Sequence, residues 1–307
     1  MERRALGSLS VSVVGVGCNN FGSRLDEEAS AAVVHAALDA GVTLFDTADI
    51  YGKGQSEVFL GRALRGRRDE ALIATKFGMP VDDEHFGASP AYVRSACRAS
   101  LARLGVDHLD LFQLHYPDES VPIDDTLGAL GELVEAGLVR EVGCSNLSAD
   151  QLRAAWVASA GRPGFASIQN QYSLLARDPE HDGVLDACRE LKVGLLPYYP
   201  LANGLLTGKF HPGEAVPEGT RLALMPPERA VHWLSERFQH AVDDLLAYAQ
   251  EIGVPILTLA FSWLLDHPEV ASVIAGASSP VQVRANAAAA HHLAPEVRAR
   301  LDALTAP

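Results

Sequence analysis

Four side chains within the first 115 residues could together deliver a proton to a carbonyl oxygen: Asp46, Tyr51, Lys76 and His115. A free tyrosine has a pKa of about 10 and is a poor acid near neutrality. A neighbouring lysine ammonium stabilises the phenolate and lowers the pKa of the phenol. Asp46 would keep Lys76 charged and oriented, and His115 would hydrogen-bond the substrate oxygen. The set predicts that Tyr51 donates a proton to a developing alkoxide.

This chemistry needs a second component, because no side chain supplies a hydride and the hydride must come from a cofactor. Each residue also has an ordinary structural interpretation. Asp46 and Lys76 could form a simple buried salt bridge, Tyr51 could lie in a loop without a chemical role, and His115 could be a structural histidine. The catalytic interpretation depends on elements that bring all four to one place.

Those elements are short apolar runs that alternate with amphipathic stretches. The runs predict eight strands, over 11–16, 42–46, 71–76, 109–115, 139–144, 166–170, 193–197 and 270–275. Spacing and end signals predict helices over 27–40, 56–64, 90–104, 123–136, 148–158, 183–191, 233–252 and 257–265, with a final helix over 281–290. This alternation predicts an α/β (β/α)8 TIM barrel, a single domain over 1–307, with a long loop after strand 7 at 201–232.

Barrel enzymes build their sites at the C-terminal ends of the strands. The second predicted strand ends at Asp46, shortly before Tyr51, the third ends at Lys76, and the fourth ends at His115. Four such residues from three consecutive units would therefore meet at one mouth. Polar pairs also follow the next three strands, at 145–146, 169–170 and 198–199.

Segments 41–52, 74–78, 110–115, 142–146, 168–174 and 198–209 resemble, in order and spacing, signatures of the aldo-keto reductase superfamily, of the bacterial aldo/keto reductase type. The resemblance covers essentially the whole chain. It implies an NAD(P)H-dependent oxidoreductase that reduces an aldehyde or ketone to an alcohol. It also implies that Tyr51 is the general acid, that Lys76 and Asp46 tune it, and that His115 orients the carbonyl.

The resemblance extends to the cofactor. It implies carboxamide contacts from Ser145, Asn146 and Gln169, a nicotinamide stacked on Tyr198, a pyrophosphate loop that includes Tyr199, Leu201, Asn203 and Lys209, and a 2′-phosphate and adenine site at Gly276, Ser278, Gln282 and Asn286. Cys18 and Asn19, in the turn after the first strand, are expected to reach the nicotinamide. Substrate contacts are expected from Phe21, Tyr51, His115 and Tyr116.

The choice between cofactors stays open. Many superfamily members place lysine or arginine at the positions of Gly276, Ser278 or Gln282, and a 2′-phosphate would want such a cation. Arg284 is the one nearby cation in this segment. NADP(H) is favoured by the superfamily, and NAD(H) is possible because of this departure.

Two other functions remain as alternatives. An NAD-dependent aldose or lactol dehydrogenase would suit a site without a 2′-phosphate clamp. A nicotinamide-binding regulatory subunit, as in the channel β subunits of the superfamily, would keep the same four residues. The absence of an added N-terminal arm makes the regulatory subunit the less favoured interpretation.

Composition limits the partners. Lys and Arg total 25 against 39 Asp and Glu, a net charge of −14, which argues against a nucleic-acid partner. We expect a small-molecule carbonyl substrate, no membrane partner and no metal site, and the oligomeric state stays undetermined. The four cysteines lie in no CxxC pair, which suggests buried thiols and a cytoplasmic protein. We expect the first residues to begin a folded β unit rather than an export signal.

Overall fold

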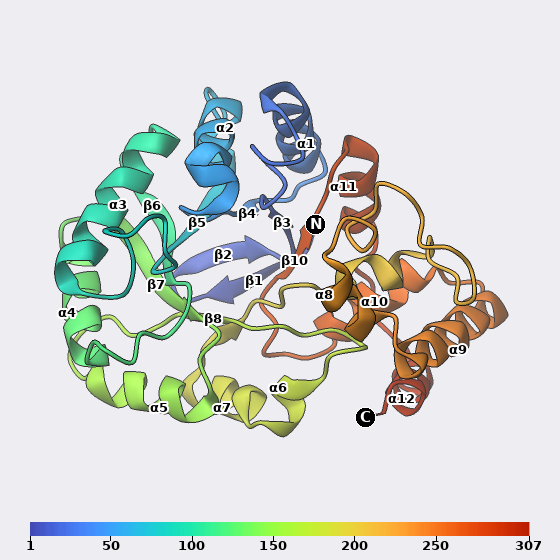
Figure 1. Ribbon diagram of the computed structural model, residues 1–307. Coiled ribbons are helices and arrows are strands. Elements are labelled where there is room, and N and C mark those ends of the chain that lie inside the picture. The colour runs from blue at the N-terminus through green and yellow to red at the C-terminus, as the bar shows by residue number, and fades with distance from the viewer. Residues whose placement is uncertain (307) are drawn as a thin grey trace.

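The predicted barrel is present in the computed structural model, which describes residues 1–306 (Figure 1). Its strands are β3 (Val14–Gly17), β4 (Leu44–Asp46), β5 (Leu72–Phe77), β6 (Leu109–Leu114), β7 (Val139–Ser145), β8 (Ser167–Gln169), β9 (Gly194–Leu195) and β10 (Val273–Gly276). They form one parallel sheet in the order β10-β3-β4-β5-β6-β7-β8-β9. A parallel bridge between Leu195 and Val270 joins the two edges, so the sheet closes on itself.

Helices surround the strands, and local sequence signals set several of their ends. They are α1 (Glu27–Asp39), α2 (Gln55–Ala63), α3 (Pro90–Leu104), α4 (Ile123–Glu135), α5 (Ala149–Ala158), α6 (Asp178–His181), α7 (Val184–Leu191), α8 (Pro227–Trp233), α9 (Glu236–Ile252), α10 (Ile256–Leu265), α11 (Pro280–Ala287) and α12 (Pro295–Leu304), with 3-10 turns η1 (Tyr51–Gly54), η2 (Arg68–Glu70) and η3 (Ala202–Thr207). Ser89 caps α3 by accepting from the Tyr92 amide, and Ser148 and Gln151 form a capping box on α5.

An N-terminal hairpin was not predicted. Strands β1 (Arg3–Leu6) and β2 (Leu9–Ser12) pair antiparallel, and their Leu6 and Leu9 pack beneath the inward-facing Leu44 and Leu111 of the barrel. The single strand predicted over 11–16 is wrong, because the chain leaves β2 at Ser12 before it enters β3. The Ser12 hydroxyl donates to the Val14 carbonyl, which supports this break. The hairpin therefore covers the end of the barrel opposite the strand C-termini.

The second half differs from prediction in three places. The 201–232 loop contains η3 and most of α8, and the helix predicted over 233–252 begins only at Glu236, as α9, because Trp233 ends α8 instead. Helix α12 follows the helix that was predicted to be the last. Helices α9 and α10 meet at a bend of 98°. Within residues 1–306 no single helix is long and apolar enough to cross a membrane, although this bent pair reaches that length and composition when both halves are counted.

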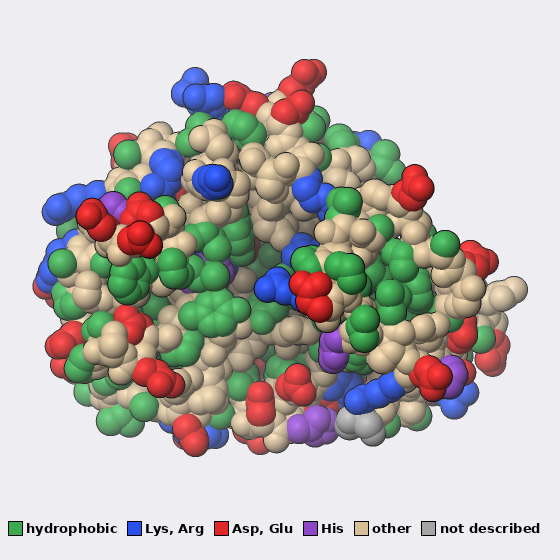
Figure 2. Space-filling model, in the orientation of Figure 1, with side chains coloured by type: hydrophobic (Ala, Val, Ile, Leu, Met, Phe, Trp, Pro, Cys, Tyr) green, Lys and Arg blue, Asp and Glu red, His purple; other side chains and the backbone are tan. Residues whose placement is uncertain are grey.

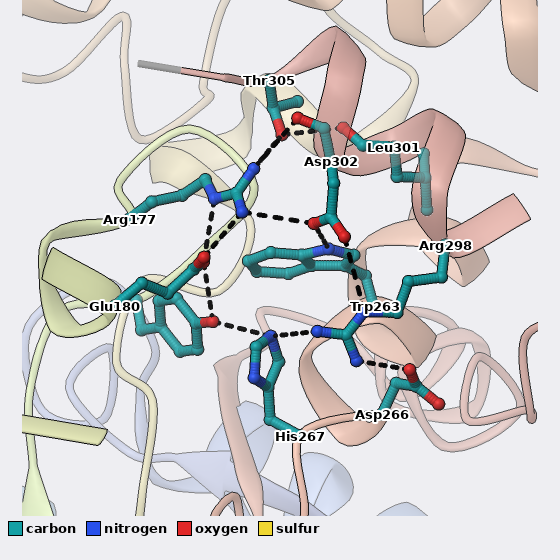
Figure 3. A network of polar contacts seen from close by, with 10 residues as sticks. Arg177, Glu180, Trp263, Asp266, His267, Arg298, Leu301, Asp302 and Thr305 are labelled. Carbon is teal, nitrogen blue, oxygen red and sulfur yellow. Dashed lines mark hydrogen bonds and ion pairs between the residues drawn. The ribbon is translucent and has the colours of Figure 1, made fainter. Parts of the chain in front are cut away.

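A network of charged and aromatic side chains attaches α12 to the barrel (Figure 3). The indole Nε1 of Trp263 on α10 donates to Asp302 on α12 at 2.8 Å, and Arg177 pairs with the same carboxylate. The guanidinium of Arg298 donates to His267, which also contacts the Tyr172 hydroxyl. Burial and then the Arg298 charge lower the pKa of His267 to about 4, so the imidazole is neutral near pH 7. The network therefore adds polar contacts to the apolar packing of Leu301, the buried residue of α12, against the core.

Candidate active site

The strands present a layer of polar side chains at their C-terminal ends. The register pairs Lys76 with Gln113 and Ser145 with Gln169 across neighbouring strands. Side chains alternate between the two faces of a strand, so residues two positions earlier also point into the barrel. At those positions stand apolar residues such as Leu44 and Leu111. The alternation thus places an apolar floor below and a polar layer at the mouth.

Lys76 lies at the centre of the polar layer and is fully buried. Its Nζ donates to Asp46 Oδ2 at 2.6 Å, to the Thr47 carbonyl at 2.9 Å and to Tyr51 Oη at 3.4 Å. The three donors of the ammonium therefore all have acceptors. The structure brings Asp46, Tyr51 and Lys76 together as the sequence predicted, and the aspartate and the tyrosine share one lysine.

Asp46 is held by two glutamines as well as by Lys76. Gln169 Nε2 donates to Asp46 Oδ1 at 2.9 Å, and Gln113 Nε2 donates to the same oxygen at 3.2 Å. Gln113 was not predicted as a site residue. The sequence could have indicated it, because Gln113 precedes His115 by two positions on the same predicted strand and so points to the same face. Three donors, one from each of three side chains, thus orient the carboxylate and keep it a pure acceptor.

The turn after Tyr51 is sharply folded. Gly52, Lys53 and Gly54 all have positive φ, of 55°, 54° and 84°. A Cβ on Gly52 would lie 2.7 Å from the Phe21 carbonyl oxygen, so this position needs glycine for space as well as for conformation. The tight turn directs Tyr51 back over the barrel mouth, where its ring meets His115 edge to face with centroids 5.9 Å apart.

Burial and charge set the protonation states of these groups. Burial raises the pKa of Tyr51 above its ordinary value and Asp46 adds to the rise, although Lys76 opposes it. Burial lowers the pKa of Lys76, but Asp46 and Tyr51 raise it more, so the amine stays charged. Burial, then Lys76, lowers the pKa of His115 to about 3. Near pH 7 the site therefore holds a protonated phenol, an ammonium and a neutral imidazole.

A cavity of about 970 Å³ opens over this layer. Space-filling shows it as a hollow near the middle of the visible face (Figure 2). Sixteen of the sequence-predicted site residues line it: Asn19, Asp46, Tyr51, His115, Tyr116, Ser145, Asn146, Gln169, Tyr198, Tyr199, Leu201, Asn203, Lys209, Gly276, Ser278 and Gln282. Segments from seven barrel strands and from the long 201–232 segment thus meet around one space.

Four predicted residues do not line the cavity. Lys76 lies beneath it, in contact with Tyr51. Cys18 and Phe21 are fully buried in the apolar core, which corrects their predicted contacts with the nicotinamide and the substrate. Asn286 is buried on α11 and also lies outside the lining. Cys18 and Phe21 immediately follow β3, so their chain position suggested the mouth while their apolar side chains turned to the core.

Arginines that no motif indicated complete the lining. Arg24, Arg221 and Arg229 reach the cavity from loops and from α8, and blue side chains flank the hollow in Figure 2. Arg221 Nη2 donates to the Tyr199 hydroxyl at 2.7 Å, with its guanidinium 4.5 Å from that ring's centroid. Arg24 donates to the Gly219 carbonyl at 2.6 Å. Arg284, the cation proposed from sequence, is exposed and outside the lining.

The lining fits a nicotinamide cofactor. Side chains with both donors and acceptors stand at the ends of β7 and β8, where Tyr198 Oη donates to Asn146 Oδ1 at 2.8 Å and Ser145 Oγ donates to the Gln169 carbonyl at 2.7 Å. Asn203 Oδ1 is buried and has no hydrogen-bond partner within residues 1–306. A carboxamide has both donors and acceptors and so matches these side chains. The four cations of the lining, which are Arg24, Lys209, Arg221 and Arg229, suit the phosphates of such a cofactor.

Comparison with known proteins gives the family. The chain matches the model of the aldo/keto reductase family over residues 13–306. It is 36% identical over 267 residues to probable aldo-keto reductase 1 of Glycine max, an alignment that covers 84% of this chain and 75% of that protein. It is 33% identical over 297 residues to a probable voltage-gated potassium channel subunit beta of Arabidopsis thaliana, which covers 93% of this chain and 90% of that protein.

Solved structures agree with the sequence comparison. Aldo-keto reductase AKR11C1 from Bacillus halodurans, in its holo form, superposes with a TM-score of 0.80 and 33% identity, covering 99% of this chain and 96% of that one. The glycerol dehydrogenase AKR11B4 from Gluconobacter oxydans gives a TM-score of 0.83 and 28% identity, covering 99% and 95%. Both the fold and the resemblance expected from the motifs are confirmed, and the chain belongs to the aldo/keto reductase family.

Proposed function

We propose that this protein reduces an aldehyde or ketone to an alcohol with NADPH, and that Tyr51 is the general acid. Membership of the family supports a nicotinamide-dependent oxidoreductase acting on small carbonyl compounds. The observation that carries the finer proposal is the contact of Tyr51 Oη with the buried Lys76 ammonium at 3.4 Å, directly beneath the cavity. The fixed positive charge of Lys76 stabilises the phenolate that remains after proton transfer and opposes the rise in the pKa of Tyr51 that burial causes.

The four residues Asp46, Tyr51, Lys76 and His115, here called the tetrad, each have one task in this proposal. Tyr51 holds the proton, because its raised pKa keeps the phenol protonated near neutrality. Lys76 stabilises the phenolate left after transfer, and Asp46 keeps the ammonium in place. His115 Nδ1 is buried without a partner within residues 1–306, so Nε2 is the nitrogen that can reach a carbonyl oxygen. The bound cofactor would supply the hydride, held near Ser145, Asn146, Gln169 and Tyr198.

A panel of aldehydes, ketones and sugars, assayed with both NADPH and NADH, tests this proposal. We expect reduction of at least one reactive carbonyl with NADPH. Oxidation of sugars with NAD⁺ in preference to all reductions would favour the aldose or lactol dehydrogenase. Tight binding of cofactor with no turnover of any compound would favour a regulatory subunit, the candidate supported by the 33% identity to the Arabidopsis channel subunit.

The cations of the cavity are proposed to hold the phosphates of the cofactor. The sequence segment at 273–286 offered only Arg284, whereas the folded chain brings Arg24, Arg221 and Lys209 to the cavity. A guanidinium can form two parallel hydrogen bonds with a phosphate, which suits the extra phosphate of NADPH. This arrangement supports NADP(H) over NAD(H). It would also let a chain with a net charge of −14 bind an anionic cofactor.

Replacing Arg24 or Arg221 by glutamine is expected to weaken NADPH binding by about tenfold or more, since a hydrogen bond to a charged group contributes about 1.5–3 kcal/mol. Fluorescence titration with NADPH and NADH measures the effect. Arg284→Gln, on an exposed face of α11, is the matched control and should leave both affinities unchanged. The assignment fails if Arg284→Gln alone weakens NADPH, or if the wild-type protein binds NADH as tightly as NADPH.

The cytoplasmic location is also part of the proposal. Its support is that every cysteine is buried as a free thiol, as expected in a reducing compartment: Cys18, Cys97, Cys144 and Cys188. Burial raises the pKa of each of these thiols, so none is poised as a reactive thiolate. Catalysis by a cysteine nucleophile is therefore not part of the proposed chemistry.

A further inference from the structure

A second group of buried charges lies behind the Tyr51 turn, separate from the Asp46–Lys76 pair. Its members are Asp49, Glu57 and Arg103, from the turn, α2 and α3. Glu57 is fully buried and well paired, because Arg103 Nε donates to it at 2.5 Å and Thr75 Oγ1 donates at 2.6 Å. Asp49 is also buried, at 3% exposure, but it has no cation of its own. The group therefore holds two carboxyls and one guanidinium.

The Asp49 carboxyl is poorly satisfied as an anion. Its Oδ1 is buried and has no hydrogen-bond partner within residues 1–306. Its Oδ2 faces the Tyr92 hydroxyl of α3 at a long 3.4 Å. A buried carboxylate with so few donors costs free energy, whereas a neutral carboxylic acid in the same place costs much less. The surroundings therefore favour the protonated form.

Asp49 is also mechanically connected to the catalytic residues. Its backbone amide donates to the Lys76 carbonyl at 3.3 Å, and the Tyr51 amide donates to the Ala48 carbonyl at 3.2 Å. The Asp49 side chain meets α3 through Tyr92. Asp49 thus joins the turn that carries Tyr51, the strand that carries Lys76 and a helix of the outer layer.

We propose that Asp49 is a positioning residue which, as a neutral carboxylic acid, seats the Tyr51 turn against α3, and whose ionisation slows proton donation by Tyr51. The inference rests on the proposed function and adds a regulation of the same site by pH. Ionisation releases the Asp49 proton to solvent and leaves a negative charge two residues from Tyr51. That buried charge lacks donors, so it destabilises the contact of the carboxyl with Tyr92 and shifts the turn that places the Tyr51 phenol over Lys76.

The charged groups around Asp49 place its titration near neutrality. Burial and then the Glu57 carboxylate raise the pKa of Asp49, to about 7 after the opposing effects of Arg103, the Ile50 amide and Tyr92. Beyond Tyr92, the loop before α3 presents His85, whose ring lies 6.3 Å from that of Tyr92, and Asp82, which pairs with His85. Of these groups only Arg103 and the imidazole of His85 can offset a negative charge on Asp49, and Arg103 already pairs with Glu57.

Asp49→Asn tests the proposal, because asparagine keeps the shape of the neutral acid and cannot ionise. For the wild-type protein we expect kcat of carbonyl reduction, at saturating cofactor, to fall by about threefold or more as pH rises from about 6 to 8. In Asp49→Asn this inflection should be absent, with the cofactor KM unchanged. Asp150→Asn, at a fully exposed carboxylate on α5, is the control for a change of charge and should keep the wild-type profile.

A second measurement needs no turnover. The unfolded carboxyl has its ordinary pKa of 3.8 and the folded one a pKa of about 7, so the folded state binds more protons between these values. The wild-type protein should therefore lose stability relative to Asp49→Asn as pH rises through this window. The difference between their melting temperatures should widen from about pH 5 to pH 8, with Asp49→Asn the more stable at the higher pH.

The outcomes separate this inference from the proposed function. In an active enzyme, the same pH profile in wild type and Asp49→Asn overturns the inference and leaves the reductase proposal standing. A melting-temperature difference that does not change with pH overturns it as well. A protein that reduces no carbonyl overturns the proposed function and with it the kinetic coupling, whereas a widening melting-temperature difference still supports the titration of Asp49.

Discussion

Replacing Tyr51 by phenylalanine is expected to lower the rate of carbonyl reduction by about 10²–10⁴-fold, the usual contribution of a positioned general acid. The ring remains and only the hydroxyl is lost, so the cavity keeps its shape. Cofactor affinity should stay within about twofold, because the cations proposed to hold the phosphates lie elsewhere in the cavity. Steady-state kinetics with a reactive aldehyde and fluorescence titration of NADPH measure the two quantities on one sample.

A matched control for this change is Tyr248→Phe, a partly buried tyrosine on α9 that is not part of the cavity lining. It removes the same hydroxyl from the same protein and should leave the rate unchanged. If Tyr51→Phe retains wild-type turnover, Tyr51 is not the general acid. If both variants lose cofactor binding, the change acts through the fold and the catalytic assignment loses its support.

Lys76→Met is expected to reduce kcat by about 10²-fold or more, because the charge that stabilises the Tyr51 phenolate is removed. It should also lower the free energy of unfolding by about 3–5 kcal/mol, the usual cost of leaving one member of a buried ion pair without its partner. The cost falls on Asp46, which would keep only the amides of Gln113 and Gln169 as donors. Urea denaturation measures the stability, and single-turnover kinetics measure the chemical step.

The double variant Asp46→Asn with Lys76→Met separates these two effects. Both charges are absent, so much of the stability should return, since no buried carboxylate is left unpaired. The rate should stay low, because the phenol still lacks its positive neighbour. Recovery of both stability and rate in the double variant would show that Lys76 acts only as a structural partner of Asp46.

Local sequence patterns were sufficient for most of the barrel. Ser89 before Pro90 predicted the start of α3, and the Ser148–Gln151 capping box predicted that of α5, because a cap depends on residues within one turn of each other. Similarly, a strand that ends at Lys76 and the next that ends at Gln113–His115 must bring those ends together in a parallel sheet. The tetrad could therefore be located before its distances were known.

Other features could not be predicted because they depend on contacts between distant segments. Helix α12 buries Leu301, and its Asp302 is also held by Trp263 on α10 and by Arg177 just before α6 (Figure 3). The N-terminal hairpin is stabilised by packing under the barrel strands. In the sequence, the apolar run over 11–16 joins the end of β2 to β3 and therefore looks like one strand. Arg24 and Arg221 are 197 positions apart in the sequence, and no local sequence pattern connects them.

By itself the sequence determined the family, the order of the barrel elements and the identity of Asp46, Tyr51, Lys76 and His115, since these depend on short motifs and on alternation within strands. Only the tertiary structure decided how deeply those residues are buried and in which direction their pKa values shift. Burial raises the pKa of Tyr51 despite Lys76, whereas the sequence predicted a lowered one. Desolvation and charge depend on everything that packs around a group, and a net charge of −14 on the chain still leaves a cavity lined by arginines.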